Sequence, residues 1–130
     1  MTDMEHDTKP YKIQIVDPEV AHRIELGREL SSAGYEVSDA ATCKTAMKQY
    51  KSGKVPDMTI SELRFNEKMD GFELMKYVKG NHPTTKFLVL THFADLKNAL
   101  VSKKFGAEDF VSKPYDIGEL IRYIERIRRD

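Results

Sequence analysis

The run Lys86 to Thr91, KFLVLT, constrains the fold more than any other stretch of the chain. Its apolar residues are consecutive, so both faces of a strand formed there have to be covered by other elements. A strand covered on both faces is typical of a parallel sheet with helices packed on each side. The run therefore predicts a central strand of an α/β domain, and it places Thr91 and His92 at the carboxyl end of that strand.

Four other short runs also have the composition of strands. Lys12 to Val16 alternates apolar and polar residues, and Met58 to Ser61 lies between a Pro-Asp turn signal and a polar loop. The segments between the runs carry apolar residues at helical spacing instead. In chain order, the predicted strands are Lys12–Val16, Tyr35–Ala40, Met58–Ser61, Lys86–Thr91 and Asp109–Ser112.

Five helices are predicted, one after each strand. Pro18 suits the first turn of the first helix and Gly34 its end, Thr42 can cap the second helix, and Gly71 opens the third. The apolar residues at helical spacing, expected to face the core, are Val20, Ile24, Gly27 and Leu30 in the first helix; Ala46, Met47 and Tyr50 in the second; Leu74, Met75 and Val78 in the third; Leu96, Ala99, Leu100 and Phe105 in the fourth; and Ile117, Leu120, Ile121, Ile124 and Ile127 in the last.

Alternating strands and helices require parallel pairing through right-handed crossovers. We therefore expect a three-layer α/β/α sandwich with a five-stranded parallel sheet and five helices, and a flavodoxin-like strand order of 2-1-3-4-5. In such a sheet the functional groups gather outside the carboxyl ends of the strands. Asp17, Glu62, Thr91 and Lys113 follow or end four of the strands, so this order predicts that they converge.

Length and composition limit the remaining choices. The 130 residues contain no linker rich in Pro, Gly or Ser, so we expect one domain over residues 11–130 after a mobile polar tail over residues 1–10. The 21 basic and 21 acidic residues balance, which gives no argument for a direct nucleic-acid partner or an anionic membrane. A single cysteine, Cys43, and the absence of a long apolar run favour a cytoplasmic protein without a membrane segment.

Histidines and cysteine do not form a recognisable metal motif. His6, His22, His82 and His92 show no paired spacing, and no Cys-x-x-Cys pair or glycine-rich phosphate loop occurs. We therefore expect no structural zinc.

Several motifs in order resemble the response regulator receiver domain of two-component signalling, as in chemotaxis regulators. The resemblance covers about Lys12 to Arg128. Its motifs are KIQIVD, AGYEV, PDMTISEL, MDGFELM, FLVLT, FGAEDFVSKPY and GELI. It implies a phosphoryl switch, in which an aspartate at the end of the third strand accepts a phosphoryl group from a histidine kinase. Mg²⁺ held by acidic residues offsets the charge, and a hydroxyl and a lysine bind the phosphoryl oxygens. By this resemblance Thr91 matches the switch hydroxyl, Lys113 the lysine and Phe110 the aromatic switch residue.

Three departures from the family pattern fall on the chemistry. Glu62 stands at the position of the phosphorylated aspartate, and its extra methylene shifts the carboxylate by about 1.5 Å, enough to spoil in-line attack. Pro18 replaces an acidic metal ligand, which leaves Asp17, Glu62 and the backbone of Arg64 as a vestigial site. His92 stands where a small residue leaves room for the phosphoryl group, and we expect its bulk to fill that room.

The leading interpretation is a pseudo-receiver, which is not an enzyme and acts in phosphorelay signalling through protein contacts without normal aspartyl phosphorylation. One alternative is a working phospho-receiver with an atypical acceptor, and another is a flavodoxin-like domain that binds a small molecule. No cofactor is expected beyond weak Mg²⁺. A salt link between the longer Glu62 and Lys113 is expected to stand in for the phosphoryl group.

Partner contacts are expected on the side of the last two helices, which the family uses for output. The partner would be a histidine kinase or an output protein, and the chain itself a monomer or a weak homodimer through these helices. The residues predicted for this side are Lys103, Lys104, Phe110, Glu119 and Arg122.

Overall fold

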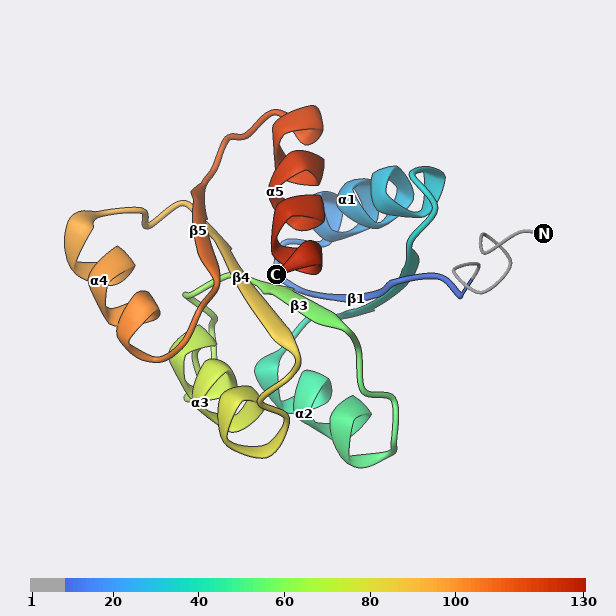
Figure 1. Cartoon of the computed structure of the whole chain (residues 1–130). Coiled ribbons are helices and arrows are strands. Elements are labelled where there is room, and N and C mark those ends of the chain that lie inside the picture. Colours follow the sequence, from blue (N-terminus) through green and yellow to red (C-terminus); the bar gives the residue numbers. More distant parts are fainter. Residues whose placement is uncertain (1–8) are drawn as a thin grey trace.

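The computed structural model describes residues 9–130, so most of the expected tail over residues 1–10 lies outside the described part of the chain. Among these residues no helix is long and apolar enough to cross a membrane. Strands and helices alternate from end to end (Figure 1). In order they are β1 (Lys12–Val16), α1 (Val20–Ser32), β2 (Glu36–Ala40), α2 (Cys43–Lys51), β3 (Met58–Ser61), α3 (Gly71–Asn81), β4 (Lys86–Thr91), α4 (Leu96–Lys104), β5 (Asp109–Ser112) and α5 (Ile117–Arg129).

The five strands form one parallel sheet in the order β2-β1-β3-β4-β5, which confirms the predicted topology. Ser61, at the end of β3, pairs with Val16 of β1 on one side and with Val89 of β4 on the other. Thr91 pairs with Ser112 at the end of β5. This register brings the carboxyl ends of β1, β3, β4 and β5 to one edge of the sheet, where parallel α/β sheets hold their functional groups.

Helices cover both faces of the sheet. α1 and α5 lie on one face, and α2 and α3 on the other, with α4 beside α3 (Figure 1). β4 shows why both layers are needed: Leu88 and Leu90 are buried in the cluster that contains α1 and α5, and Phe87 and Val89 in the opposite cluster. The continuous apolar run of β4 is therefore buried on both faces, as the sequence predicts.

Gly71 at the start of α3 is required by close packing under the end of β3. A Cβ atom at this position would lie 2.3 Å from the backbone oxygen of Glu62 and 2.8 Å from the Cα of Leu63. The Gly71 N–H also donates to the backbone oxygen of Leu63 over 2.9 Å. The glycine thus holds the start of α3 directly against the residue that follows β3.

The predicted core face of α1 is wrong at its first turns. Val20 and Ile24 are 56% and 51% exposed, whereas Leu26 and Leu30 are buried. His22 and Arg23 take the inner positions instead, because both side chains bind Asp17 or its backbone oxygen. Pro18 is also misplaced by the prediction, since it precedes the N-cap residue Glu19 and lies outside the helix.

The predicted core face of α4 is also wrong. Leu96 and Leu100, predicted to face the core, are 74% and 59% exposed. Its buried residues are Asn98 and Ser102, which are polar. The side chain of Asn98 donates to the backbone oxygen of Phe93 over 2.9 Å, so a specific tertiary hydrogen bond accounts for one of the two inward polar residues.

Candidate functional site

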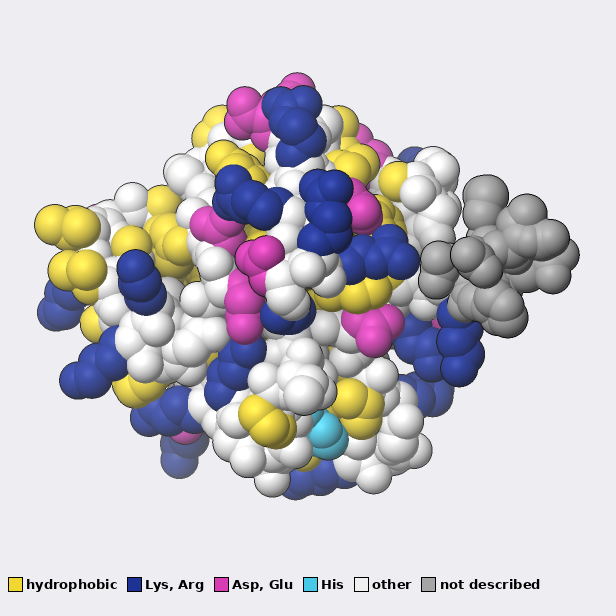
Figure 2. Space-filling model, in the orientation of Figure 1, with side chains coloured by type: hydrophobic (Ala, Val, Ile, Leu, Met, Phe, Trp, Pro, Cys, Tyr) yellow, Lys and Arg dark blue, Asp and Glu magenta, His cyan; other side chains and the backbone are white. Residues whose placement is uncertain are grey.

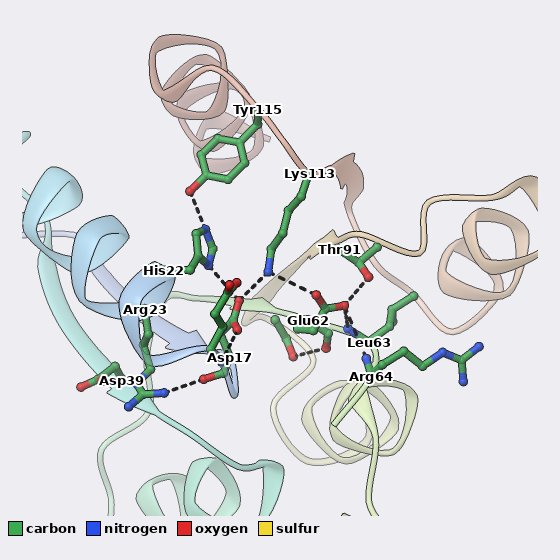
Figure 3. Close-up of polar contacts among 12 residues, drawn as sticks. Asp17, His22, Arg23, Asp39, Glu62, Leu63, Arg64, Thr91, Lys113 and Tyr115 are labelled. Carbon is green, nitrogen blue, oxygen red and sulfur yellow. Dashed lines mark hydrogen bonds and ion pairs between the residues drawn. The ribbon is translucent and has the colours of Figure 1, made fainter. Parts of the chain in front are cut away.

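Four polar side chains converge at the carboxyl edge of the sheet, as the topology predicts (Figure 3). Asp17 follows β1, Glu62 follows β3, Thr91 ends β4 and Lys113 follows β5. All four are buried, with exposures between 0% for Thr91 and 7% for Lys113. Buried polar groups need partners, and here each is the partner of another.

The ammonium group of Lys113 joins the two carboxylates. Its Nζ lies 2.7 Å from Oδ2 of Asp17 and 3.2 Å from Oε1 of Glu62. Burial acts to raise the pKa of Asp17, but hydrogen bonds from His22, Lys113 and the backbone of Glu19, with the charge of Lys113, hold that pKa below its usual value. Asp17 is therefore ionised at neutral pH, as its pairing with Lys113 requires.

Both carboxylate oxygens of Glu62 are occupied. Oε1 faces Lys113, and Oε2 accepts hydrogen bonds from the hydroxyl of Thr91 and from the backbone N–H of Leu63 at 2.7 Å. The N–H of Arg64 points to the same oxygen over 3.4 Å. The donors around the end of β3 are thus already engaged by the side chain that follows this strand.

A histidine and a tyrosine that the sequence reasoning did not assign to the site extend the network. Nδ1 of His22, on α1, lies 2.9 Å from Oδ2 of Asp17, and its Nε2 lies 2.7 Å from the hydroxyl of Tyr115. The N–H of Glu19 donates to the other Asp17 oxygen over 2.8 Å. The available signals were a histidine one turn into the helix after Asp17 and an aromatic residue directly after Lys113-Pro114.

Arg23 fixes the end of β1 from the other side. Its Nη1 donates to the backbone oxygen of Asp17 over 2.7 Å, and its Nε donates to Oδ2 of Asp39 over 2.7 Å. Asp39 belongs to β2, so this side chain ties the residue after β1 to the neighbouring strand. Asp17 is therefore held through its carboxylate and through its backbone.

Other predicted site residues lie around this network without joining it. Pro18 is exposed next to Asp17. His92, which is expected to fill the phosphoryl space, has an exposed side chain and lines, with Lys113 and Tyr115, a cavity of about 580 Å³ between α1 and the β5–α5 connection. Glu62, by contrast, is buried and its side chain reaches Lys113.

The residues predicted for the output side lie on α4, β5 and α5, away from the crevice. Lys103 and Lys104 are exposed at the end of α4, and Glu119 and Arg122 are exposed on α5. Phe110 of β5 is partly buried against the cluster under α2 and α3. The aromatic residue is therefore the one predicted output residue that also contacts the core.

Among residues 9–130, one group could hold a metal ion: Asp17, Glu19 and His22 have ligand atoms within 4.8 Å of one another. An imidazole beside two carboxylates suits a transition metal better than Mg²⁺, which prefers oxygen ligands in octahedral geometry. Oδ2 of Asp17 is in addition bonded to the Lys113 ammonium. The donor set does not fit Mg²⁺ in this arrangement.

Comparison with known proteins agrees with the fold. The family model described as "Response regulator receiver domain" matches residues 13–125. The chain is 34% identical to the DNA-binding transcriptional regulator NtrC of Klebsiella pneumoniae, over 86% of this chain and 24% of that protein. It is 32% identical to the transcriptional regulatory protein ZraR of Salmonella typhimurium, over 88% of this chain and 25% of that protein. The chain thus spans about a quarter of the length of these relatives.

Solved structures show the same likeness. A CheY-like response regulator receiver domain protein from Methanospirillum hungatei superposes with a TM-score of 0.88 at 25% identity, covering 93% of this chain and 95% of that one. The chemotaxis response regulator CheY4 of Vibrio cholerae gives a TM-score of 0.81 at 29% identity, covering 92% and 99%.

Proposed function

The chain belongs to the response regulator receiver domain family, and we propose that it is an atypical member that signals through protein contacts without normal aspartyl phosphorylation. In this proposal it is a pseudo-receiver with no catalytic turnover, it works in the cytoplasm, and its partner is a histidine kinase or an output protein. The family assigns the chain to two-component signal transduction. The pseudo-receiver status is our inference from the crevice.

One observation carries the proposal: the Glu62 carboxylate occupies the donors that a phosphoryl group would need. Lys113, Thr91 and the backbone N–H of Leu63 all bind it. Phosphoryl transfer depends on in-line position and on donors around the charged oxygens. A carboxylate that is bonded on both oxygens is poorly placed to attack, and a phosphorylated Glu62 would have to displace its own contacts.

The metal that supports phosphorylation in the family is also expected to bind poorly. Magnesium would have to compete with the Lys113 ammonium for both Asp17 and Glu62. Pro18 supplies no ligand in place of the second acidic residue. We therefore propose that the chain binds Mg²⁺ weakly at best.

The Glu62–Lys113 link then substitutes for the phosphoryl group as a fixed bias. The cost of desolvating both groups offsets part of their attraction, so such a buried link favours one conformation by about 1–3 kcal/mol. Because Glu62 also binds Thr91, the bias reaches the end of β4 and the segment leading to α4. The side formed by α4, β5 and α5 is accordingly proposed to stay in one partner-binding conformation.

Intact mass after incubation with acetyl phosphate and Mg²⁺ tests the proposal. The wild-type chain is expected to stay unmodified. The double variant Pro18→Asp, Glu62→Asp restores the acidic pair and the shorter acceptor, so it is the matched control that should gain one phosphate. A wild-type gain of one phosphate that disappears in Glu62→Gln would overturn the pseudo-receiver proposal.

A working phospho-receiver is the second candidate, because Glu19 lies beside Asp17 and could supply the acidic ligand that Pro18 lacks. Amide chemical shifts during a Mg²⁺ titration separate the two. Saturable shifts around Asp17 and Glu62 at sub-millimolar Mg²⁺, lost in Glu19→Gln, would favour the working receiver. Shifts that do not saturate at millimolar Mg²⁺ would favour the pseudo-receiver.

A further inference from the structure

Asp17, Glu19 and His22 form a group of candidate metal ligands that differs in kind from a magnesium site. Their ligand atoms lie within 4.8 Å of one another around the start of α1. Mg²⁺ prefers oxygen ligands, whereas Zn²⁺ and other transition metals bind an imidazole nitrogen together with carboxylates. The imidazole of His22 therefore separates this group from an ordinary cluster of acidic residues.

The atoms Nδ1 of His22 and Oδ2 of Asp17 nearly have the separation that one metal ion requires. They are 2.9 Å apart, and both side chains are largely buried, with 14% and 4% exposed. Two ligands of a tetrahedral Zn²⁺ ion, each bound at about 2.0–2.1 Å, lie about 3.3 Å from each other. A zinc ion can therefore replace the proton between these two atoms if the side chains move apart by about 0.4 Å.

Tyr115 fixes the His22 ring in an orientation that suits a metal ligand (Figure 3). The Nε2 atom of His22 lies 2.7 Å from the Tyr115 hydroxyl. In metal sites, the second ring nitrogen of a histidine ligand is normally bonded to an oxygen atom, which fixes the tautomer and the ring orientation. With a metal at Nδ1, the proton of the neutral ring lies on Nε2 and is donated to the Tyr115 oxygen. The partner that a histidine ligand needs is thus already in place.

The cavity beside this group gives a metal ion access and room for water ligands. Glu19 and His22 line the cavity of about 580 Å³ between α1 and the β5–α5 connection. The other acidic and basic residues of its lining are Glu25, Glu29, Asp116, Lys113 and His92. The Lys113 ammonium and the N-terminus of α1 oppose a cation, but the ammonium is already paired with Asp17 and Glu62. The acidic excess of the lining therefore favours a bound cation.

We propose that Asp17, Glu19 and His22 bind a divalent transition-metal ion such as Zn²⁺ in preference to Mg²⁺, with water from the cavity completing the coordination. The site shares Asp17 with the magnesium site that the family resemblance implies, but it uses neither Glu62 nor the backbone of Arg64. Two carboxylates and one histidine have no paired histidine or cysteine spacing, so the sequence does not reveal the site. The inference goes beyond the proposed function, because metal binding here requires no phosphorylation.

An NMR titration of the full chain with Zn²⁺ alone or Mg²⁺ alone tests the inference. Zinc at micromolar concentration is expected to give saturable amide shifts at residues 17–23, and a change in the ring nitrogen shifts of His22 that marks a metal on Nδ1. Mg²⁺ at millimolar concentration should neither saturate the same shifts nor displace the zinc. Removal of the zinc with a chelator should restore the original spectrum.

Substitutions around the metal should weaken zinc binding in a graded way. Tyr115→Phe removes only the partner of a ligand, and it should weaken binding by about 10–100-fold. His22→Gln removes the nitrogen ligand and should weaken binding more than Tyr115→Phe does. Glu19 is exposed, so Glu19→Gln should fold normally and separates the loss of a ligand from damage to the fold.

His82→Gln is the matched control, and it should leave zinc binding unchanged. His82 is also a partly buried histidine beside a tyrosine, since the centre of its ring lies 5.0 Å from that of Tyr50. It lies at the end of α3, on the opposite face of the sheet from α1, and Figure 2 shows a histidine at the surface there.

Three results would overturn the inference. Equal weakening by His22→Gln and His82→Gln would show only adventitious binding to histidines. Loss of zinc binding in Glu62→Gln, with retention in Glu19→Gln and His22→Gln, would assign the metal to the magnesium position of the family. Saturation of the same amides by Zn²⁺ and Mg²⁺ at equal concentrations would show that the site has no preference for a transition metal.

Discussion

Replacing Lys113 with methionine should destabilise the domain more than removal of any other lysine that pairs with a carboxylate. The side chain of Lys113 is 4% exposed, and it pairs with Asp17 and Glu62, whose side chains are 4% and 5% exposed. Lys113→Met keeps most of the side-chain volume but leaves two buried carboxylates near each other without the cation. The cost therefore comes from charge and not from a cavity.

The size of this destabilisation follows from the burial of the ion pairs that Lys113 forms. Removing one partner of a buried ion pair costs about 3–5 kcal/mol, a large part of the 5–15 kcal/mol by which a domain of this kind is stable. Glu62→Gln should cost about 1–2 kcal/mol, since Lys113 retains Asp17 as a partner. The double variant Lys113→Met, Glu62→Gln should cost about 1–3 kcal/mol less than the sum of the two single-variant costs. Both single variants remove the same Lys113–Glu62 link, and the double variant can lose it only once.

Urea denaturation of the wild type, the two single variants and the double variant measures these free energies of unfolding. Lys79→Met is the matched control: Lys79 also lies 2.7 Å from a carboxylate oxygen, that of Glu108, but its side chain is 17% exposed. It should cost about 1 kcal/mol. Costs for Lys113→Met and Lys79→Met that are equal, or single-variant costs that simply add, would refute the reasoning.

Two further predictions concern Asp17 and Gly71. The pKa of Asp17 is lowered in the folded state, so its stabilising contribution is present above the usual aspartate pKa and is lost as pH falls through the lower value. The free energy of unfolding should therefore fall less steeply below about pH 4 in Asp17→Asn than in the wild type; parallel curves would contradict this. Gly71→Ala should destabilise by about 1–3 kcal/mol, since its Cβ would lie 2.3 Å from the Glu62 oxygen. Gly80→Ala, with nothing within 4 Å, should instead be neutral or stabilise by up to about 1 kcal/mol in thermal unfolding, and the opposite ranking would contradict the packing argument.

The strands could be predicted from sequence because burial on the sheet leaves a local pattern. β1, β4 and β5 have the bounds that the sequence predicts, and the parallel topology then fixes which strand ends meet. The convergence of Glu62 and Lys113 follows from this topology together with the length of a glutamate side chain. Neither the strand bounds nor this convergence depends on a side-chain contact that the sequence pattern does not show.

The helix faces could not be predicted in the same way. The inner face of α1 contains His22 and Arg23 because Asp17 binds them, and α4 turns Asn98 inward because the Phe93 carbonyl accepts its amide. Apolar spacing alone cannot show that a polar residue will be drawn inward by a partner elsewhere in the fold. The outward position of His92 depends likewise on the β4–α4 connection, which no local pattern specifies.

Hydrogen exchange across residues 95–125 tests most directly whether the Glu62–Lys113 link fixes the conformation of the α4, β5 and α5 side. The comparison needs the wild type, Glu62→Ala and Lys113→Ala, each under conditions where it remains folded. We predict that both variants lose protection in α4 and β5, while protection in α2 stays as in the wild type. Unchanged protection over residues 95–125 in both variants, together with unchanged partner binding, would show that the crevice is inert and that the domain is a plain scaffold.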